Sequence, residues 1–285
     1  MNLIYHCCRQ RAGPLVINAA GICPKYSPSG QAAKPASQYR RCCANRSPLD
    51  RLEARLALIG WDATHYVLTF DDAHLPKKYG GVQAALKNFI KSARRWRSKC
   101  GKPPDFDWAA VIEGQHGEKR YHIHFVCDYS DLSPAEVVHL WRYGIIPPDE
   151  EERIGTPVLL DKQGFFRLAR YLTKEPRDGT IIPLGKHEFS TSQSLAAKVP
   201  PPKLWVADAL RFTPPRGAIC VQPERGERMA PRPTPYGLYW RREWLVPDWT
   251  PACRRAMLRM GYIDEVFEHE LSLSLRARPR ATYLQ

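Results

Sequence analysis

The segment Tyr121–Cys127 constrains the fold of this chain most strongly, because large apolar residues alternate in it with two histidines. In a β-strand, successive side chains point to opposite faces of the sheet. His122 and His124 are therefore predicted to share one face, while the apolar residues around them enter a core on the other. Two imidazoles at this spacing make half of a metal site, although a solvated or hydrogen-bonded pair of histidines fits the same spacing.

A second strand is predicted directly upstream, at Asp107–Glu113, and Gly114–Arg120 between the two strands has the composition of a hairpin turn. Pairing the strands about this turn places Glu113 opposite His122. Directly opposed residues share a sheet face, with Cβ atoms roughly 5 Å apart. We therefore predict that Glu113, His122 and His124 bind a divalent ion. The mixed imidazole and carboxylate set favours Mn²⁺, with Mg²⁺ as the abundant alternative.

A helix is predicted over Gln163–Lys174, and Pro176 ends it. Its apolar residues recur at helical spacing and form a predicted buried stripe, which comprises Phe165, Leu168, Ala169 and Leu172. Arg167, Tyr171 and Lys174 project together from the other face. A phenol between two cations suits a nucleophile whose neighbours bind a phosphate and lower its pKa. The alternative is an ordinary amphipathic helix with a tyrosine at its boundary.

The order of these features resembles the HUH endonuclease superfamily, and within it the single-tyrosine rolling-circle replication initiators of small phages, plasmids and single-stranded DNA viruses. Three segments carry the resemblance in register. Tyr66–Pro76 is similar to the first motif, Ile112–Phe125 to the second and Ala169–Lys174 to the third. Phe189–Leu195 is similar to a Ser-rich strand that often follows in the phage forms. The resemblance covers residues 61–195.

The resemblance implies a metal-dependent endonuclease that breaks a phosphodiester of single-stranded origin DNA by transesterification. Tyr171 would form a 5′-phosphotyrosyl link and leave a free 3′-hydroxyl, and the reverse reaction would seal the displaced strand. Lys174 would hold the phosphate or stabilise developing charge, and Arg167 and Arg170 would bind DNA. Some relatives carry a second tyrosine near the third motif, whereas Glu-Pro follows Lys174 here, which points to one nucleophile. A host helicase and polymerase are the implied protein partners.

Two other functions fit the same constellation. A single-tyrosine transposase or relaxase uses the same groups in a different biology, and a catalytically inactive DNA-binding regulator could retain the fold. The phage-like first motif, the Ser-rich strand and the basic extensions favour a replication initiator over a transposase. Retention of Glu113, His122, His124 and Tyr171 argues against an inactive regulator, because such a protein needs none of them on one face.

The net charge of +14 implies a polyanionic partner. Most of the excess lies at the two ends: residues 1–60 hold 9 Lys and Arg against 2 Asp and Glu, residues 61–200 hold 20 against 18, and residues 201–285 hold 14 against 9. In the central part, one helix-like run concentrates cations without an acid. We expect that run to contact DNA phosphates through Lys91, Arg94, Arg95 and Arg97; a solvated helix face is the alternative.

The predicted fold class is α+β, with a five-stranded, largely antiparallel sheet, flanking helices and a nuclease domain like that of the HUH/Rep proteins. The predicted strands are 65–70, 107–114, 121–128, 156–160 and 186–192. The predicted helices are 47–58, 81–99, 133–143, 163–174 and a last one around 250–277. We assign residues 1–60 to a basic, Cys-containing N-terminal extension that is irregular up to 46, residues 61–197 to the endonuclease domain, and residues 198–285 to a Pro-rich linker and a helical, aromatic and basic region.

Five of the nine cysteines lie within the first 43 residues, but their spacing does not suit one tetrahedral ion, so we expect unligated thiols, with a degenerate zinc knuckle as the alternative. No apolar run approaches ~20 residues and the N-terminus does not have the pattern of a signal peptide. We therefore expect no membrane partner and a cytoplasmic location. The segment Gly179–Lys186 has five residues between its glycines and fails as a P-loop, so a built-in ATPase is not expected.

Overall fold

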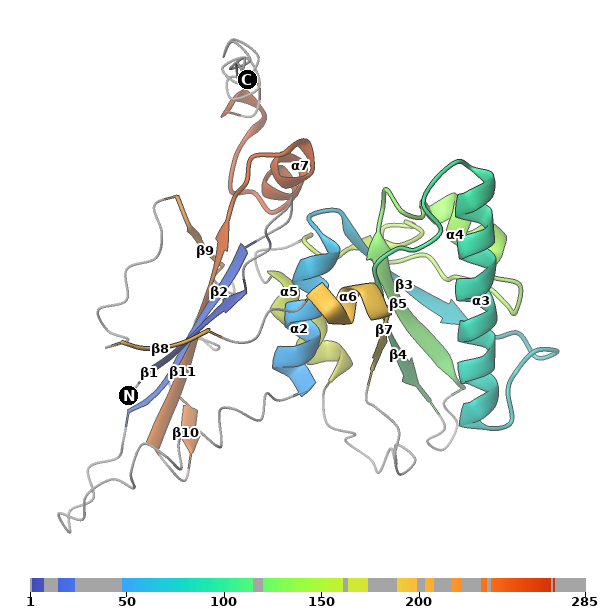
Figure 1. The fold of residues 1–285 in the computed structure, drawn as a ribbon, viewed down its shortest axis with the longest axis horizontal. Coiled ribbons are helices and arrows are strands. Elements are labelled where there is room, and N and C mark those ends of the chain that lie inside the picture. Colours follow the sequence, from blue (N-terminus) through green and yellow to red (C-terminus); the bar gives the residue numbers. More distant parts are fainter. Residues whose placement is uncertain are drawn as a thin grey trace, which may run out of the picture.

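The computed structural model describes residues 2–7, 15–23, 48–114, 120–160, 164–173, 189–198, 203–207, 217–221, 232–234, 237–267 and 269. These residues form two β-sheets, and helices α2 (Pro48–Ile59) and α5 (Gly164–Leu172) lie between them (Figure 1). No helix in the described part of the chain combines the length and apolar character needed to cross a membrane.

The central sheet has five strands in the order β6-β3-β5-β4-β7. Every neighbouring pair is antiparallel. The strands are β3 (Ala63–Thr69), β4 (Trp108–Glu113), β5 (His122–Asp128), β6 (Thr156–Pro157) and β7 (Ser190–Thr191). The five-stranded antiparallel sheet and the α+β class are thus confirmed, and each strand falls on or next to its predicted range.

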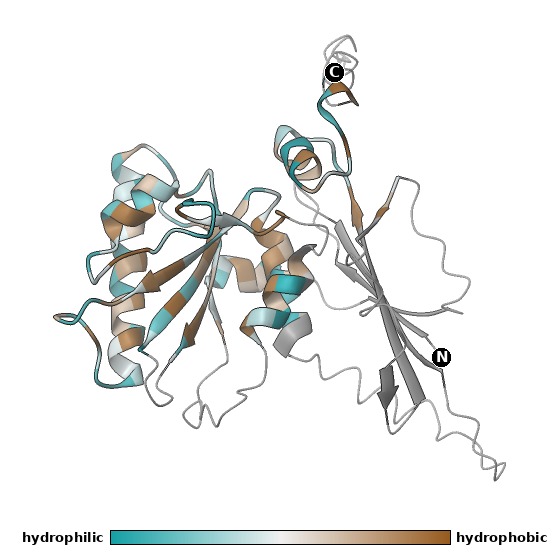
Figure 2. Cartoon of the chain, turned by 180° about the vertical axis from the view of Figure 1, so that it is seen from behind, coloured by the Kyte–Doolittle hydropathy of each residue, from teal (hydrophilic) through white to brown (hydrophobic). Residues whose placement is uncertain are grey.

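One face of this sheet packs against α3 (Tyr79–Lys99) and α4 (Pro134–Leu140). Ile123 and Phe125 of β5 are fully buried there, and the ring of Phe125 meets that of Phe89 edge-on at 5.1 Å between centroids. Figure 2 shows apolar residues along the central strands and on the helices beside them. The alternation predicted for β5 is therefore present, with its odd-numbered residues in this core.

The other face packs against α2, α5 and α6 (Gln193–Lys198). Phe165 and Ala169 of α5 are fully buried against it, together with Val126 of β5. Helix α7 (Pro251–Arg259) contributes Met257 to the same core. It lies within the range of the last predicted helix and covers part of it. The indole Nε1 of Trp61 donates to the Asp248 carboxylate at 3.1 Å, which also ties the segment before α7 to the start of β3.

A second, six-stranded sheet was not predicted. Its order is β10-β11-β2-β1-β8, with β9 also paired to β11. Its strands are β1 (Asn2–Cys7), β2 (Leu15–Cys23), β8 (Lys203–Ala207), β9 (Ile219–Val221), β10 (Arg232–Thr234) and β11 (Gly237–Val246). The expectations of an irregular segment up to residue 46 and of a linker after 198 are therefore wrong in these ranges. The cause is non-local pairing: β2 pairs with β11, from Leu15 opposite Val246 to Cys23 opposite Leu238.

Candidate metal centre and nucleophile

The β4–β5 hairpin brings the three predicted metal ligands together. Glu113 pairs with His122 in the register that the turn predicted. The Oε2 atom of Glu113 lies 3.4 Å from Nε2 of His122 and 3.3 Å from Nε2 of His124. The two Nε2 atoms are 3.2 Å apart. One donor atom from each residue lies within 4.8 Å of the others, so two imidazole nitrogens and a carboxylate oxygen converge as a divalent ion requires.

The burial of these side chains leaves one side of the cluster accessible. The side chain of His124 is 2% exposed, whereas those of His122 and Glu113 are 25% and 26% exposed. His124 is more buried because it lies two residue pairs further from the hairpin turn than His122, between Val67 on β3 and Val111 on β4. An ion held by three protein atoms with one open side retains positions for water or substrate.

Glu113 carries the negative charge of the cluster. Burial alone would raise the pKa of its carboxyl group, but hydrogen bonds from His122 and His124 outweigh burial and hold that pKa well below its usual range. The carboxylate is therefore ionised at neutral pH, which is the form that binds a cation.

Helix α5 places Tyr171 beside this cluster. The Tyr171 ring meets the His124 ring edge-on, with centroids 5.6 Å apart and an interplanar angle of 89°. Tyr171 is 45% exposed, while Phe165 and Ala169 bury the opposite stripe of the helix as predicted. The candidate nucleophile and the candidate ligands, which are far apart in the sequence, are thus neighbours.

The pKa of Tyr171 differs from the sequence-based expectation. Burial and the negative charge of Glu113 raise it above the usual range of a phenol, whereas neighbouring cations were expected to lower it. Arg167 is exposed one helical turn before Tyr171, and Arg170 is half-buried beside it. Their DNA-binding role stays a prediction. Lys174 lies outside the described residues.

The basic run on α3 is not part of this cluster. Helix α3 packs on the sheet face that carries Ala110 and Ile123, and the candidate metal ligands lie on the opposite face with Val111 and Val126. Three of the four predicted DNA-binding cations of the run are exposed, and they line a groove of about 670 Å³ between α3, β4 and residues 190–193; these are Lys91, Arg94 and Arg95. Any phosphate bound there is separated from the candidate metal centre by the sheet.

Arg97 does not fit the DNA-binding role predicted for it. It is 4% exposed, and its guanidinium donates to the carbonyl oxygens of Pro103 at 2.8 Å and Asp131 at 2.6 Å. It also forms an ion pair with the Asp131 carboxylate at 3.0 Å and lies over the Phe106 ring. Arg97 is a structural residue that joins the end of α3 to the turn after β5.

We expect Arg97→Ala to lower the free energy of unfolding by roughly 2–4 kcal/mol, because it leaves two carbonyls and a half-buried carboxylate without their donor. Urea denaturation followed by circular dichroism measures the change. Arg95→Ala, which removes an exposed guanidinium from the same helix, should cost less than about 0.5 kcal/mol. Equal losses for both variants would contradict the structural role of Arg97.

His65 is a neighbour of the site that the sequence analysis missed. Its Nε2 lies 2.9 Å from Nδ1 of His124, and the two rings are nearly parallel, with centroids 5.1 Å apart. Burial, followed by the proximity of His124, lowers the pKa of His65 to about 3, so its imidazole is neutral in neutral solution. Strand alternation puts His65 on the same face of β3 as Val67, which pairs with His124. The alternation in β3 therefore places His65 near His124 only if β3 pairs with β5, and this pairing could not be predicted from the sequence.

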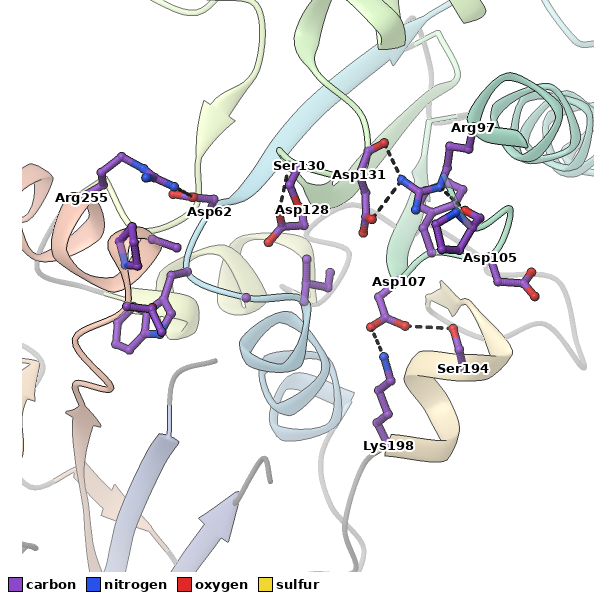
Figure 3. A pocket seen from close by; sticks show the side chains of 18 residues that line it. Asp62, Arg97, Asp105, Asp107, Asp128, Ser130, Asp131, Ser194, Lys198 and Arg255 are labelled. Carbon is purple, nitrogen blue, oxygen red and sulfur yellow. Dashed lines mark hydrogen bonds and ion pairs between the residues drawn. The ribbon is translucent and has the colours of Figure 1, made fainter. Parts of the chain in front are cut away.

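A second pocket, of about 660 Å³, lies at the opposite end of the strands and is lined by several carboxylates (Figure 3). These carboxylates already have partners within the protein. Asp62 pairs with Arg255, Asp107 accepts from Lys198 at 2.5 Å, and Asp128 accepts from its own turn at Ser130. We interpret the ion pairs in this pocket as structural contacts that hold α6 and α7 against the end of the sheet.

Comparison of the chain with protein-family models, with curated proteins and with solved structures gives no match.

Proposed function

We propose that this protein is a replication initiator of the HUH type, which nicks single-stranded origin DNA by metal-dependent tyrosine transesterification and later rejoins the strand. The observation that carries the proposal is the convergence of Glu113, His122 and His124, with the ring of Tyr171 against His124. A dedicated nucleophile next to a divalent-ion site is the minimum that this reaction needs.

The residues of the cluster would bind an ion through two imidazole nitrogens and one carboxylate oxygen. When bound, a divalent ion would polarise a non-bridging oxygen of the scissile phosphodiester and offset its negative charge. Mn²⁺ suits the mixed donor set best, and Mg²⁺ is the alternative. Since the ion would also offset the charge of Glu113, it would remove one of the two causes that raise the pKa of Tyr171.

Tyr171 would supply the attacking oxygen. Its phenol loses a proton, the oxygen bonds to phosphorus, and the bond from phosphorus to the 3′ oxygen breaks. The 3′ oxygen takes up a proton and leaves as a hydroxyl that a host polymerase can extend. The 5′-phosphotyrosyl link conserves the energy of the phosphodiester, so attack by a 3′-hydroxyl in the reverse direction rejoins a strand. Arg167 and Lys174 are proposed to bind the phosphates beside this site.

The accessibility of the cluster supports a single-stranded substrate. Tyr171 and the two more exposed ligands open to solvent on one side. A phosphate within stacked duplex geometry cannot align with both a tyrosine and a protein-bound ion, so the origin must be melted or folded into a hairpin. Strand separation would depend on a host helicase, because the sequence has no P-loop.

The direct test uses the full-length protein, Mn²⁺ and end-labelled single-stranded oligonucleotides that tile the DNA flanking the gene. We expect one oligonucleotide to give a protein adduct that survives denaturation, together with a shorter fragment ending in a 3′-hydroxyl. Chelation of the metal should prevent both products. Failure of every tiled sequence to give an adduct, with protein that binds Mn²⁺, would refute tyrosine transesterification.

The exposed cations of α3 are proposed to hold DNA away from the scissile phosphate. Replacing Lys91, Arg94 and Arg95 together by Gln should weaken binding of single strands of any sequence and flatten its salt dependence by roughly 0.7 units of slope per lost phosphate contact. Cleavage of a saturating oligonucleotide should survive, because these residues lie across the sheet from the metal centre.

The control for this triple variant is Lys99→Gln, which removes an exposed cation from the same helix but outside the groove. Affinity against salt concentration is measured for wild type and both variants. Identical slopes for wild type and the triple variant would mean that the α3 cations are solvated surface.

A further inference from the structure

His65 contacts the proposed metal centre without being one of its three ligands. It lies on β3, two residues before Val67, which pairs with His124 on β5. This places His65 on the diagonal from His124 across the strand pair, within reach of an imidazole ring. The result is a contact of 2.9 Å between Nε2 of His65 and Nδ1 of His124.

The two nitrogens of His124 have different neighbours. Nε2 faces Oε2 of Glu113 at 3.3 Å and Nε2 of His122 at 3.2 Å, whereas Nδ1 faces Nε2 of His65 at 2.9 Å. A neutral imidazole carries one N–H and one lone pair. If the lone pair on Nε2 binds an ion, the proton of His124 must be on Nδ1, from which it can be donated to Nε2 of His65. His65 must then carry its own proton on Nδ1.

Without an ion the opposite arrangement is available. Nε2–H of His124 can then donate to the Glu113 carboxylate, which leaves Nδ1 as an acceptor for Nε2–H of His65. Both arrangements use the same 2.9 Å contact, with the direction of the hydrogen bond reversed. The reversal moves one proton on each ring from Nε2 to Nδ1, so it neither takes up nor releases a proton overall.

We propose that His65 is a positioning residue, which holds His124 in the tautomer whose Nε2 lone pair faces the ion and reverses its own tautomer when the ion binds. The proposal rests on the proposed metal-dependent function. The two rings are nearly parallel, with an interplanar angle of 21°, so the contact also fixes the orientation of the His124 ring. A histidine ligand usually donates its second N–H to such a partner, and loss of that partner typically costs 10–100-fold in metal affinity or activity.

The first experiment measures Mn²⁺ affinity by calorimetry on the full-length protein. His65→Leu fills a similar volume but has no acceptor, and we expect it to bind Mn²⁺ roughly 10–100-fold more weakly. His65→Gln supplies an amide oxygen as acceptor and should recover most of that loss. His139→Leu removes an exposed imidazole elsewhere and should change nothing. Wild-type affinity in His65→Leu, or an equal loss in His65→Leu and His65→Gln, would overturn the proposal.

The second experiment reads the tautomers in the wild-type chain, so it remains decisive if His65→Leu does not fold. Nitrogen-15 shifts of the imidazoles are recorded with and without Zn²⁺, a diamagnetic probe. We expect protonated Nδ1 on both His65 and His124 with Zn²⁺, and protonated Nε2 on both without it. If the His124 signals shift on Zn²⁺ binding but the His65 tautomer does not change, the role proposed for His65 is wrong, while the proposed metal centre stands. Absence of any Zn²⁺ or Mn²⁺ binding by wild type would overturn the proposed metal centre as well.

Discussion

Tyr171→Phe is expected to abolish the covalent protein–DNA adduct, with no product above background after hours of incubation with Mn²⁺ and a cleavable origin oligonucleotide. The substitution removes only the phenolic oxygen, which is the atom that bonds to phosphorus. The aromatic ring that packs edge-on against His124 is retained, so the fold and the Mn²⁺ affinity should change little. The adduct is measured on a denaturing gel with end-labelled DNA.

The control for this result is Tyr129→Phe. Tyr129 is 53% exposed, slightly more than Tyr171, and lies directly after β5 at the opposite end of the strand from His122. It should form the adduct at the wild-type rate. A denaturation-resistant adduct in Tyr171→Phe would show that another residue is the nucleophile. DNA affinity unchanged in both variants would confirm that only chemistry was lost.

The hairpin site could be predicted because its determinants are local. The turn between β4 and β5 sets the pairing of Glu113 with His122, and strand alternation sets the face. The helix that carries Tyr171 has its own periodicity. The sequence could not show that this helix lies against the hairpin face; the order of the motifs suggested it, and the 5.6 Å ring contact with His124 now supports it.

Most of the features that could not be predicted from the sequence depend on contacts between distant segments. His65 contacts His124 only because β3 pairs with β5, and the second sheet forms because β2 pairs with β11 from the other end of the chain. Arg97 is different, because a signal was present: it follows Ala93 by four residues on the buried stripe of α3. Its charge is typical of an exposed residue, whereas its position on the apolar stripe of the helix predicts burial.

Substitution of the three proposed ligands is expected to affect Mn²⁺ binding strongly. His122→Ala and His124→Ala should each weaken Mn²⁺ binding by more than the 10–100-fold typical of an outer-sphere partner, because each removes a donor atom from the ion. Glu113→Ala should weaken it somewhat less, and Glu113→Gln, which keeps the shape and one oxygen but loses the charge, less again. Calorimetry gives the affinities, and adduct formation should fall in parallel.

The His122→Ala and His124→Ala variants should differ in their effect on stability, because the two side chains differ in burial. His124 is 2% exposed, so its loss should also lower the free energy of unfolding, by roughly 1–3 kcal/mol, while loss of the partly exposed His122 should affect mainly the ion. His74→Ala serves as control, because His74 forms a 2.8 Å pair with Asp71 on the exposed loop after β3 and should leave Mn²⁺ affinity unchanged. If all three ligand variants bind Mn²⁺ as tightly as wild type, the converging donors are only a hydrogen-bonded cluster, and the nucleophilic role of Tyr171 would need a different source of phosphate activation.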